Sequence, residues 1–357
     1  MRRLPVFFLV DVSESMIGSS LYALEEGLAE IVKALRADPH ALETVHLAVI
    51  AFAGRARTLT PLCELTAFHP PTLPVGGGTA LGAALLHLMD EIDGTVRMAT
   101  ADRKGDWRPI VFLMTDGHPT DDVGRAVDRW NASYRRFVQL IAVSIGGTAD
   151  HRVLARLTDH VLVLDDTAAG AFAGFVTWIS RSIQSQSRSV GVGKDETVSL
   201  AKADPRIMAS AADAEGLAPF AGVDERFAIF LGRCQESGQH YIVKYEQHLG
   251  RIETRDPVLA GLLQTRRYML KCTVPVARSY FDLAADEPTL QSVNSQDIIG
   301  QPSCPHCGSR SAMAVCACGG VHCITGPGEQ TCPWCGETGH YGSGGSNAGF
   351  DIGRSQG

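Results

Sequence analysis

The sequence predicts an α/β protein that begins with a doubly wound, mostly parallel sheet and continues into a small mainly β region and a compact cysteine-rich module. Short apolar runs, such as residues 6–10 and 110–114, are continuous and end in polar residues, as expected of strands buried on both faces. Segments with apolar residues at helical spacing separate these runs. Strand–helix alternation of this kind implies parallel strands with helices on both faces of the sheet. Cysteines crowd together near the C-terminus and set the last part of the chain apart.

The alternating pattern runs from residue 4 to about residue 186. In the first predicted helix leucine, isoleucine and valine recur every three or four residues, and a serine at position 19 or 20 can cap its start. In chain order, strands are predicted at residues 6–10, 45–52, 57–62, 110–114, 137–145 and 161–164. Helices are predicted at residues 21–35, 79–92, 121–137 and 168–183.

The rest of the chain divides into two further regions. A polar stretch containing serine and glycine, residues 180–193, predicts a linker. Beyond it, three apolar segments are interpreted as strands, at residues 227–231, 241–245 and 268–276. We therefore predict an α/β domain, a small mainly β connecting domain of unknown role, and a cysteine-rich module with a flexible tail. Their predicted bounds are residues 1–187, 194–300 and 301–357.

Composition narrows the class of protein. The 357 residues are 45% hydrophobic and 20% charged, which is typical of globular domains. The net charge of −7 argues against a nucleic-acid-binding surface, and no stretch approaches the ~20 apolar residues of a membrane span. Of ten cysteines, seven lie between positions 304 and 335, which favours metal binding in a reducing compartment. We expect a cytoplasmic protein without nucleic-acid or membrane partners.

Three short polar segments fit together as one metal site. They are Asp11-Val-Ser13-Glu-Ser15, Gly-Gly-Thr79 and Thr-Asp116-Gly, and each borders a predicted strand or helix. Oxygen ligands at the carboxyl ends of parallel strands suit a hard divalent cation such as Mg²⁺. Serine, aspartate and glycine after a strand are also ordinary turn formers, and Thr79 could simply cap its helix. The three segments together, in this order, favour the metal site.

These motifs resemble the metal-ion-dependent adhesion site of von Willebrand factor A domains. The resemblance implies a Rossmann-like sheet over residues 4–186. It also implies that the hydroxyls of Ser13, Ser15 and Thr79 bind the cation directly or through water, while Asp11 and Asp116 supply negative charge. One position on the metal is open in that family, and an acidic side chain of a protein partner commonly fills it.

The cysteines predict zinc. Cys304-Pro-His-Cys307-Gly and Cys332-Pro-Trp-Cys335-Gly are two C-x-x-C knuckles, and two such pairs can surround one tetrahedral ion as a zinc-ribbon-like site. Between them lie further candidate ligands, which either bind a second zinc ion, share in the first site, or are spare: Cys316, Cys318, His322 and Cys323. A structural zinc is expected, because the thiolates can close the site. The remaining thiols are interpreted as ordinary buried cysteines, at positions 63, 234 and 272.

A von Willebrand-type domain followed by such a module resembles the TerY group of bacterial tellurium- and stress-resistance proteins. The shared features include Cys-Pro-Trp-Cys-Gly and the closing Phe-Asp-Ile-Gly-Arg at residues 350–354. The resemblance covers residues 4–186 and 301–354. It implies that the partners are a protein kinase and a PP2C-type phosphatase.

Three functions compete at this point. The leading prediction is a non-enzymatic scaffold that binds an acidic partner residue through Mg²⁺ and holds structural zinc. The first alternative is a metal- or redox-stress sensor that uses the thiol cluster, since soft thiolates bind soft metals. The second is a divalent-metal hydrolase, which needs a general base, and His118 is the candidate that the motif loops offer. Asp121 and Asp122 either strengthen the field at the cation or stabilise a helix N-terminus.

Overall fold

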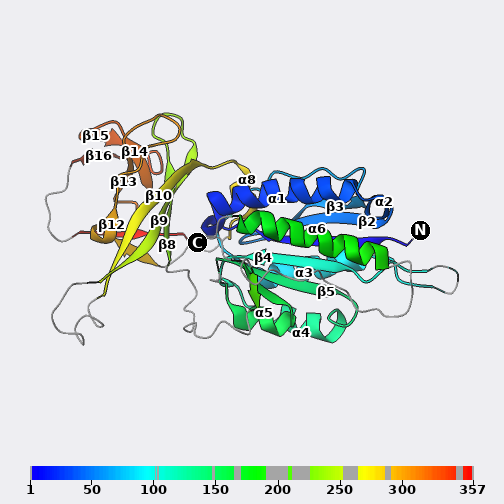
Figure 1. The fold of residues 1–357 in the computed structure, drawn as a ribbon. Helices are drawn as coiled ribbons and strands as arrows, with labels where there is room; N and C mark the ends of the chain where they lie inside the picture. The colour runs from blue at the N-terminus through cyan, green and yellow to red at the C-terminus, as the bar shows by residue number, and fades with distance from the viewer. Residues whose placement is uncertain are drawn as a thin grey trace. The chain divides into compact units, whose positions relative to one another are not determined.

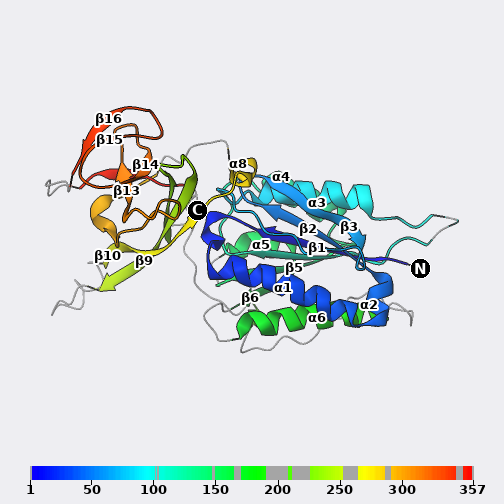
Figure 2. The same cartoon turned by 90° about the horizontal axis from the view of Figure 1, so that it is seen from above.

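The computed structural model describes residues 2–100, 102, 104–146, 149–164, 170–189, 208–210, 226–251, 264–285, 291–342 and 349–355. The chain forms two units. The first comprises Met1–Gly222 together with Phe281–Ala285, and the second comprises Val223–Tyr280 and Asp286–Gly357. Figures 1 and 2 show the elements of each unit.

The first unit contains a seven-stranded sheet in the order β3-β2-β1-β4-β5-β6-β7. Five neighbouring strands are parallel: β2 (Val45–Phe52), β1 (Leu4–Asp11), β4 (Ile110–Thr115), β5 (Gln139–Ile145) and β6 (Val161–Leu164). Antiparallel strands lie at the two edges, β3 (Ala56–Glu64) beside β2 and β7 (Met208–Ser210) beside β6. This arrangement confirms the predicted mostly parallel sheet.

Helices cover both faces of this sheet, as Figure 2 shows. One face carries α1 (Ser19–Arg36), α2 (Pro39–Thr44) and α6 (Ala171–Ser189), and the other carries α3 (Leu81–Thr95), α4 (Gly124–Ser133) and α5 (His151–Leu157). The central strand explains why both faces need cover. In β1 every residue is buried, and alternate side chains enter opposite cores: Val6, Phe8 and Val10 on one side, Phe7 and Leu9 on the other.

Several predicted bounds differ from the observed ones. The helix expected from residue 79 begins at Leu81, because Gly78 has a positive φ of 91° and Thr79 remains in the loop. Helix α6 continues through Ser189, so the first ten residues of the expected linker are helical, and residues 190–193 lie outside the described residues. The short helix α2 was not predicted, although Asp38 before Pro39 is an ordinary helix start, and the Asp38 carboxylate accepts bonds from two backbone N–H groups.

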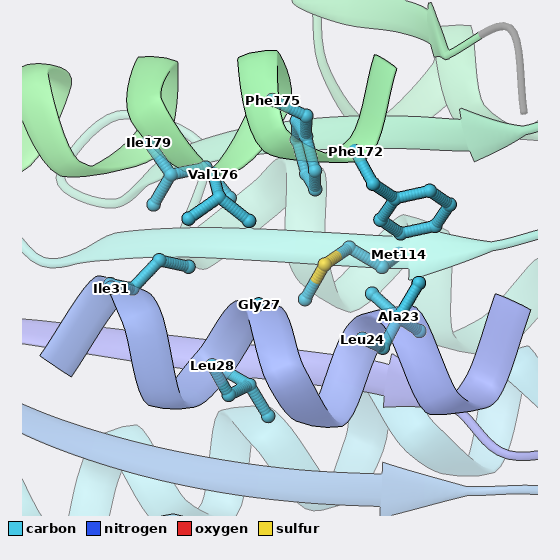
Figure 3. Close-up of a pocket in the computed structure, with 10 residues that line it drawn as sticks. All are labelled: Ala23, Leu24, Gly27, Leu28, Ile31, Met114, Phe172, Phe175, Val176 and Ile179. Carbon is cyan, nitrogen blue, oxygen red and sulfur yellow. The ribbon is translucent and has the colours of Figure 1, made fainter. Parts of the chain in front are cut away.

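Helices α1 and α6 approach each other closely at Gly27. A Cβ atom at this position would lie 2.9 Å from Cγ2 of Val176 on α6. Beside this contact lies a small pocket, shown in Figure 3, whose walls are apolar side chains of the two helices and Met114 of β4. Among the described residues, no helix combines the length and apolar composition that a membrane crossing requires.

The second unit is mainly β. Its six-stranded sheet has the order β12-β10-β9-β8-β14-β13. The strands are β8 (Phe227–Arg233), β9 (His240–Arg251), β10 (Gln264–Pro275), β12 (Ile298–Ile299), β13 (Ser311–Val315) and β14 (Val321–Ile324). The three strands predicted between residues 227 and 276 are therefore present as β8, β9 and β10. Because β14 pairs with β8, strands from before and after residue 300 share one sheet.

Two small ribbons complete this unit. Strand β15 (Gly328–Thr331) pairs with β16 (Thr338–Tyr341), and β11 (Ser292–Asn294) pairs with β17 (Asp351–Gly353). Ile352 of β17 is buried in the core of the unit, so this part of the expected flexible tail is held in place. Residues 343–348 lie outside the described residues. The short helix α8 (Ser279–Leu283) precedes β11 in the chain.

Candidate metal sites

The first candidate site lies at the carboxyl ends of β1 and β4. Asp11 is the last residue of β1, and Asp116 follows directly after β4. Because β1 and β4 are neighbouring parallel strands, the two aspartates meet at the same edge of the sheet. Ser13 and Ser15 follow β1 on a 3₁₀ turn that spans Glu14–Met16. All four side chains are buried.

Hydrogen bonds connect these side chains into one network. Ser15 Oγ donates to Asp116 Oδ1 at 2.8 Å and lies 2.8 Å from Ser13 Oγ. The backbone N–H of Ser13 donates to Asp11 Oδ1 at 2.9 Å, and Thr115 Oγ1 donates to Asp11 Oδ2 at 2.5 Å. These bonds thus hold both carboxylates and both serine hydroxyls in one connected network.

Thr79 reaches the same place from a glycine-rich loop. Gly76 N donates to Val12 O at 3.0 Å, and Ala80 N donates to Ala53 O at 2.6 Å, so the loop is attached to the ends of both β1 and β2. A Cβ atom at Gly117 would lie 3.3 Å from Thr79 Oγ1, which places the hydroxyl against the loop that carries Asp116. The structure therefore brings together all five residues predicted for this site, and their role as ligands stays a prediction.

The electrostatics of the site favour a cation. Burial and, second to it, the nearby negative charge of Asp116 outweigh the hydrogen bonds to Asp11 and together raise its pKa to about 7. Two neighbouring buried carboxylates repel each other, and a divalent cation would remove that repulsion. Hydroxyl and carboxylate oxygens are hard ligands that suit Mg²⁺, so the donor set fits the ion.

The neighbouring acidic residues stabilise helix termini. Asp121 accepts bonds from the backbone N–H groups of Gly82 and Ala83 at 3.0 and 2.9 Å, in the first turn of α3. Asp122 accepts a bond from Gly124 N, the first residue of α4, at 2.9 Å. Helix capping, one of the two roles considered for them, is the one these contacts support. Nδ1 of His118 lies 4.0 Å from Asp150 Oδ2.

Cysteines of the second unit form two groups of four thiols, and within each group the sulfur atoms lie within 4.8 Å of one another. The groups are Cys234, Cys304, Cys307 and Cys323, and Cys316, Cys318, Cys332 and Cys335. Sulfur–sulfur distances of 3.6 and 3.9 Å occur in the first group, and 3.7 and 3.8 Å in the second. Four sulfurs at about 2.3 Å from a tetrahedral zinc are about 3.8 Å apart, so both groups fit zinc.

The grouping differs from the one expected from the sequence. The knuckles at Cys304 and Cys332, expected to share one ion, contribute to different groups. The reason is the strand pairing: β14 lies beside β8, which brings Cys323 to Cys234 at the end of β8. The turn between β13 and β14 instead supplies Cys316 and Cys318 to the second group.

His322, a further candidate ligand, belongs to neither group. Its Nε2 lies 2.9 Å from the hydroxyl of Tyr341, and its Nδ1 lies 3.0 Å from the carbonyl oxygen of Cys323. The imidazole is fully buried between these partners. The contact with Tyr341 therefore links β14 to β16, and each group consists of four cysteines.

Cys234 was expected to be an ordinary buried thiol, yet it belongs to the first group. A signal was present in the sequence: Cys234-Gln-Glu-Ser237-Gly238 is a knuckle in which serine replaces the second cysteine. Its geometry matches the two Cys-x-x-Cys-Gly knuckles, and the Cys316-Ala-Cys318-Gly319 turn is a one-residue-shorter version. In each, a glycine N–H donates to the first cysteine's carbonyl oxygen at 2.8–2.9 Å, and the glycine has a positive φ: Gly238, Gly308, Gly319 and Gly336.

One thiol in each group ionises readily. Burial opposes ionisation of Cys234, but hydrogen bonds from Ser237 and neighbouring backbone N–H groups prevail and lower its pKa to about 6. A hydrogen bond from the backbone of Cys318 is the main cause that lowers the pKa of Cys316 to about 6. The thiolate is the form that binds metal. The first group is largely buried, whereas Cys318 and Cys335 of the second are exposed.

Comparisons with known proteins agree with these sites. Residues 6–169 match the von Willebrand factor type A domain, so the first unit is a domain of this class. Residues 224–357 match the TerY-C metal binding domain. The chain thus combines a von Willebrand factor type A domain with a TerY-C metal binding domain, which confirms the resemblance. The TerY-C match begins well before residue 301, inside the region for which the sequence had indicated no function.

Solved structures resemble about half of the chain. Proximal thread matrix protein 1 from the mussel byssus is 19% identical with a TM-score of 0.38, and the match covers 51% of this chain and 47% of that one. A von Willebrand factor type A protein from Catenulispora acidiphila is 17% identical with a TM-score of 0.38, over 51% and 43% of the two chains. The present chain thus spans less than half the length of either protein. No curated protein matches significantly.

Proposed function

We propose that this protein is a non-enzymatic scaffold that binds an acidic side chain of a partner protein through Mg²⁺ at the site formed by Asp11, Ser13, Ser15, Thr79 and Asp116. The observation that carries the proposal is the network at the ends of β1 and β4, where two carboxylates and three hydroxyls converge. Protein binding is the typical role of von Willebrand factor type A domains, and residues 6–169 match that class.

The chemistry of the donor set supports a carboxylate as the bound group. Three of the five side chains are neutral hydroxyls, so the protein neutralises the ion only in part. Mg²⁺ keeps octahedral geometry and retains several waters, one of which an incoming carboxylate can replace. A negatively charged ligand gains more at such an ion than at a cage made only of carboxylates.

The second unit supports a scaffold role in a particular setting. We propose a stress-response system of the tellurium-resistance type, with a protein kinase and a PP2C-type phosphatase as partners, in the cytoplasm. The match to the TerY-C metal binding domain supports this setting. The two thiol groups would hold structural zinc, because four thiolates leave no open position on a tetrahedral ion.

The test is a pull-down from native lysate in excess Mg²⁺, with partners identified by mass spectrometry. Wild type is compared with Asp116→Ala and Ser13→Ala. Asp122→Ala serves as a control, because this exposed aspartate follows Asp116 in the chain and its carboxylate accepts a bond from Gly124 N at the start of α4. A partner retained by wild type and the control and lost by both site variants would support the proposal. The same partners on all four proteins would refute it.

A second function rests on the exposure of the second thiol group. Cys318 and Cys335 are exposed, whereas Cys234, Cys304 and Cys323 of the first group are buried. An accessible thiolate can be oxidised or can exchange its metal, as a redox or metal sensor requires. Zinc release measured during peroxide titration tests this function: early release of one of two ions favours a sensor, and inert zinc favours a scaffold.

A further inference from the structure

A short segment from far along the chain belongs to the von Willebrand-type unit. Residues Phe281–Ala285, here called the strap, group with the first unit although the chain before and after them belongs to the second. Leu283 is 1% exposed and forms part of the first unit's apolar core, on the face that also contains α1 and α6. The strap is therefore a packed component of this unit.

Two backbone hydrogen bonds attach the strap to two different loops. Arg55 N donates to Leu283 O at 2.9 Å, in the turn after β2. Ala285 N donates to Gly77 O at 3.1 Å, in the glycine run that precedes Thr79. Asp282 adds a weak contact of 4.0 Å to Arg57, between two exposed side chains.

Two glycines make room for the strap. A Cβ atom at Gly54 would lie 2.1 Å from Ala285 N, and one at Gly76 would lie 2.7 Å from Leu283 Cβ. Any larger residue at these positions would collide with the strap. The absence of side chains at Gly54 and Gly76 therefore lets the strap pack directly against the backbone of the two loops.

The loop that receives the strap also positions a predicted cation ligand. Gly76, Gly77 and Gly78 are followed directly by Thr79. A run of three glycines has high conformational freedom, so its fixed shape depends on contacts made from outside. Bonds to Val12 and Ala53 hold the two ends of the loop, and Thr79 exchanges two hydrogen bonds of 2.9 Å with Thr120. The bond from Ala285 to Gly77 holds the part of the loop that precedes Thr79.

We infer that the strap is a positioning element for the cation site. By holding Gly77 it acts with the Thr120 bonds to keep the hydroxyl of Thr79 against the loop that carries Asp116, so release of the strap weakens cation binding. Thermodynamic linkage requires the converse, and cation binding holds the strap more firmly. Leu283 and Ala285 are thus positioning residues that act through the Gly76–Thr79 loop. The inference rests on the cation site of the proposed function.

Mn²⁺ binding to the zinc-loaded full chain provides the test, with free Mn²⁺ measured by electron paramagnetic resonance. Leu283→Asp places a charge in the apolar core and should release the strap. Phe281→Asp is the matched control, because it adds the same charge to the same segment at a side chain that is 44% exposed. Ala285→Pro removes the N–H that donates to Gly77 O without adding any atom to the Gly76–Thr79 loop, and it covers the case in which Leu283→Asp does not fold.

We expect Leu283→Asp and Ala285→Pro to bind Mn²⁺ about fivefold or more weakly than wild type and Phe281→Asp. A second readout is hydrogen exchange of the wild-type strap, which Mg²⁺ should slow at the Ala285 amide. The strap variants could fold, show rapid hydrogen exchange in the strap and still bind Mn²⁺ as tightly as wild type. That result would overturn the inference about the strap but not the cation site. Asp116→Ala tests the cation site itself. If wild type binds no Mn²⁺, or if Asp116→Ala binds it equally well, the proposed cation site is refuted and the role of the strap with it.

Discussion

At the scale of single residues, the cation site places two acidic side chains where water cannot solvate them. Asp11 and Asp116 are both buried, and the charge on Asp116 disfavours ionisation of Asp11. The hydrogen bonds from Thr115 and the Ser13 N–H lower the pKa of Asp11, but they offset only part of the effect of burial and of the Asp116 charge. A bound divalent cation would therefore favour the ionised form of both carboxylates.

The first prediction is that Mg²⁺ raises the thermal stability of the first unit. Mg²⁺ at about a hundred times its dissociation constant should stabilise the wild-type first unit by about 2.7 kcal/mol. Asp116→Asn should lose this response, and in Mg²⁺-free buffer it should melt no lower than wild type because one of two repelling charges is gone. Melting curves with and without Mg²⁺ check both statements. Equal Mg²⁺ responses of the two proteins would contradict the site.

A second aspartate gives a prediction about pH. The side chain of Asp106 is 3% exposed, and burial would raise its pKa. The Arg3 guanidinium and the N–H of Arg97 donate to its carboxylate and hold the pKa below its usual range. Such a carboxylate stabilises the folded state at pH values above its unfolded pKa of 3.8, and the effect is lost as pH falls through the lower folded value.

Asp106→Asn should therefore lower the free energy of unfolding by about 1–3 kcal/mol at pH 7. The difference from wild type should shrink as the pH falls below 4. Urea unfolding of the first unit at a series of pH values provides the measurement. A difference that stays constant down to pH 3 would show that the variant acts by altered packing and not through the ion pair.

At the scale of elements, two helical glycines lie in different surroundings, one packed against another helix and one facing open space. Gly27 of α1 faces α6 at a distance that leaves no room for a side chain, whereas a Cβ at Gly94 of α3 would meet nothing within 4 Å. Helix propensity disfavours both glycines equally. Tertiary packing alone distinguishes them.

We predict opposite effects of one substitution at these two glycines. Gly27→Leu should force α1 and α6 apart and cost about 1–3 kcal/mol. Gly94→Leu should stabilise by up to about 1 kcal/mol, since leucine replaces the poorer helix former in open space. Chemical denaturation of the two variants and wild type measures the contrast. Similar effects at both positions would mean that α1 and α6 do not pack as described.

At the scale of the whole chain, the two thiol groups determine how much metal the protein carries. We predict two zinc ions per chain. Cys234→Ser and Cys318→Ser should each reduce the content to one, because they remove ligands from different groups. Cys272→Ser should retain both ions, since this thiol lies in neither group. Elemental analysis of the purified proteins measures the zinc content. Two zinc ions in Cys234→Ser would show that Cys234 is not a zinc ligand.

The sequence alone determined the local features of this protein. Continuous apolar runs predicted the buried strands, and the polar residues directly after β1 and β4 predicted the cation site, because parallel strands end at a common edge. The knuckle glycines and cysteine spacing predicted zinc. These conclusions depend on residues close together in the chain, or on a topology that strand–helix alternation already implies.

The tertiary structure decided which distant segments meet. Pairing of β14 with β8 divided the thiols into groups that include Cys234, and packing of Leu283 placed the strap against the loop of Thr79. Neither partnership has a fixed spacing in sequence, because each depends on contacts between segments that many loop lengths could join. Local chemistry thus specified which side chains can bind metal, and long-range packing specified which of them bind together.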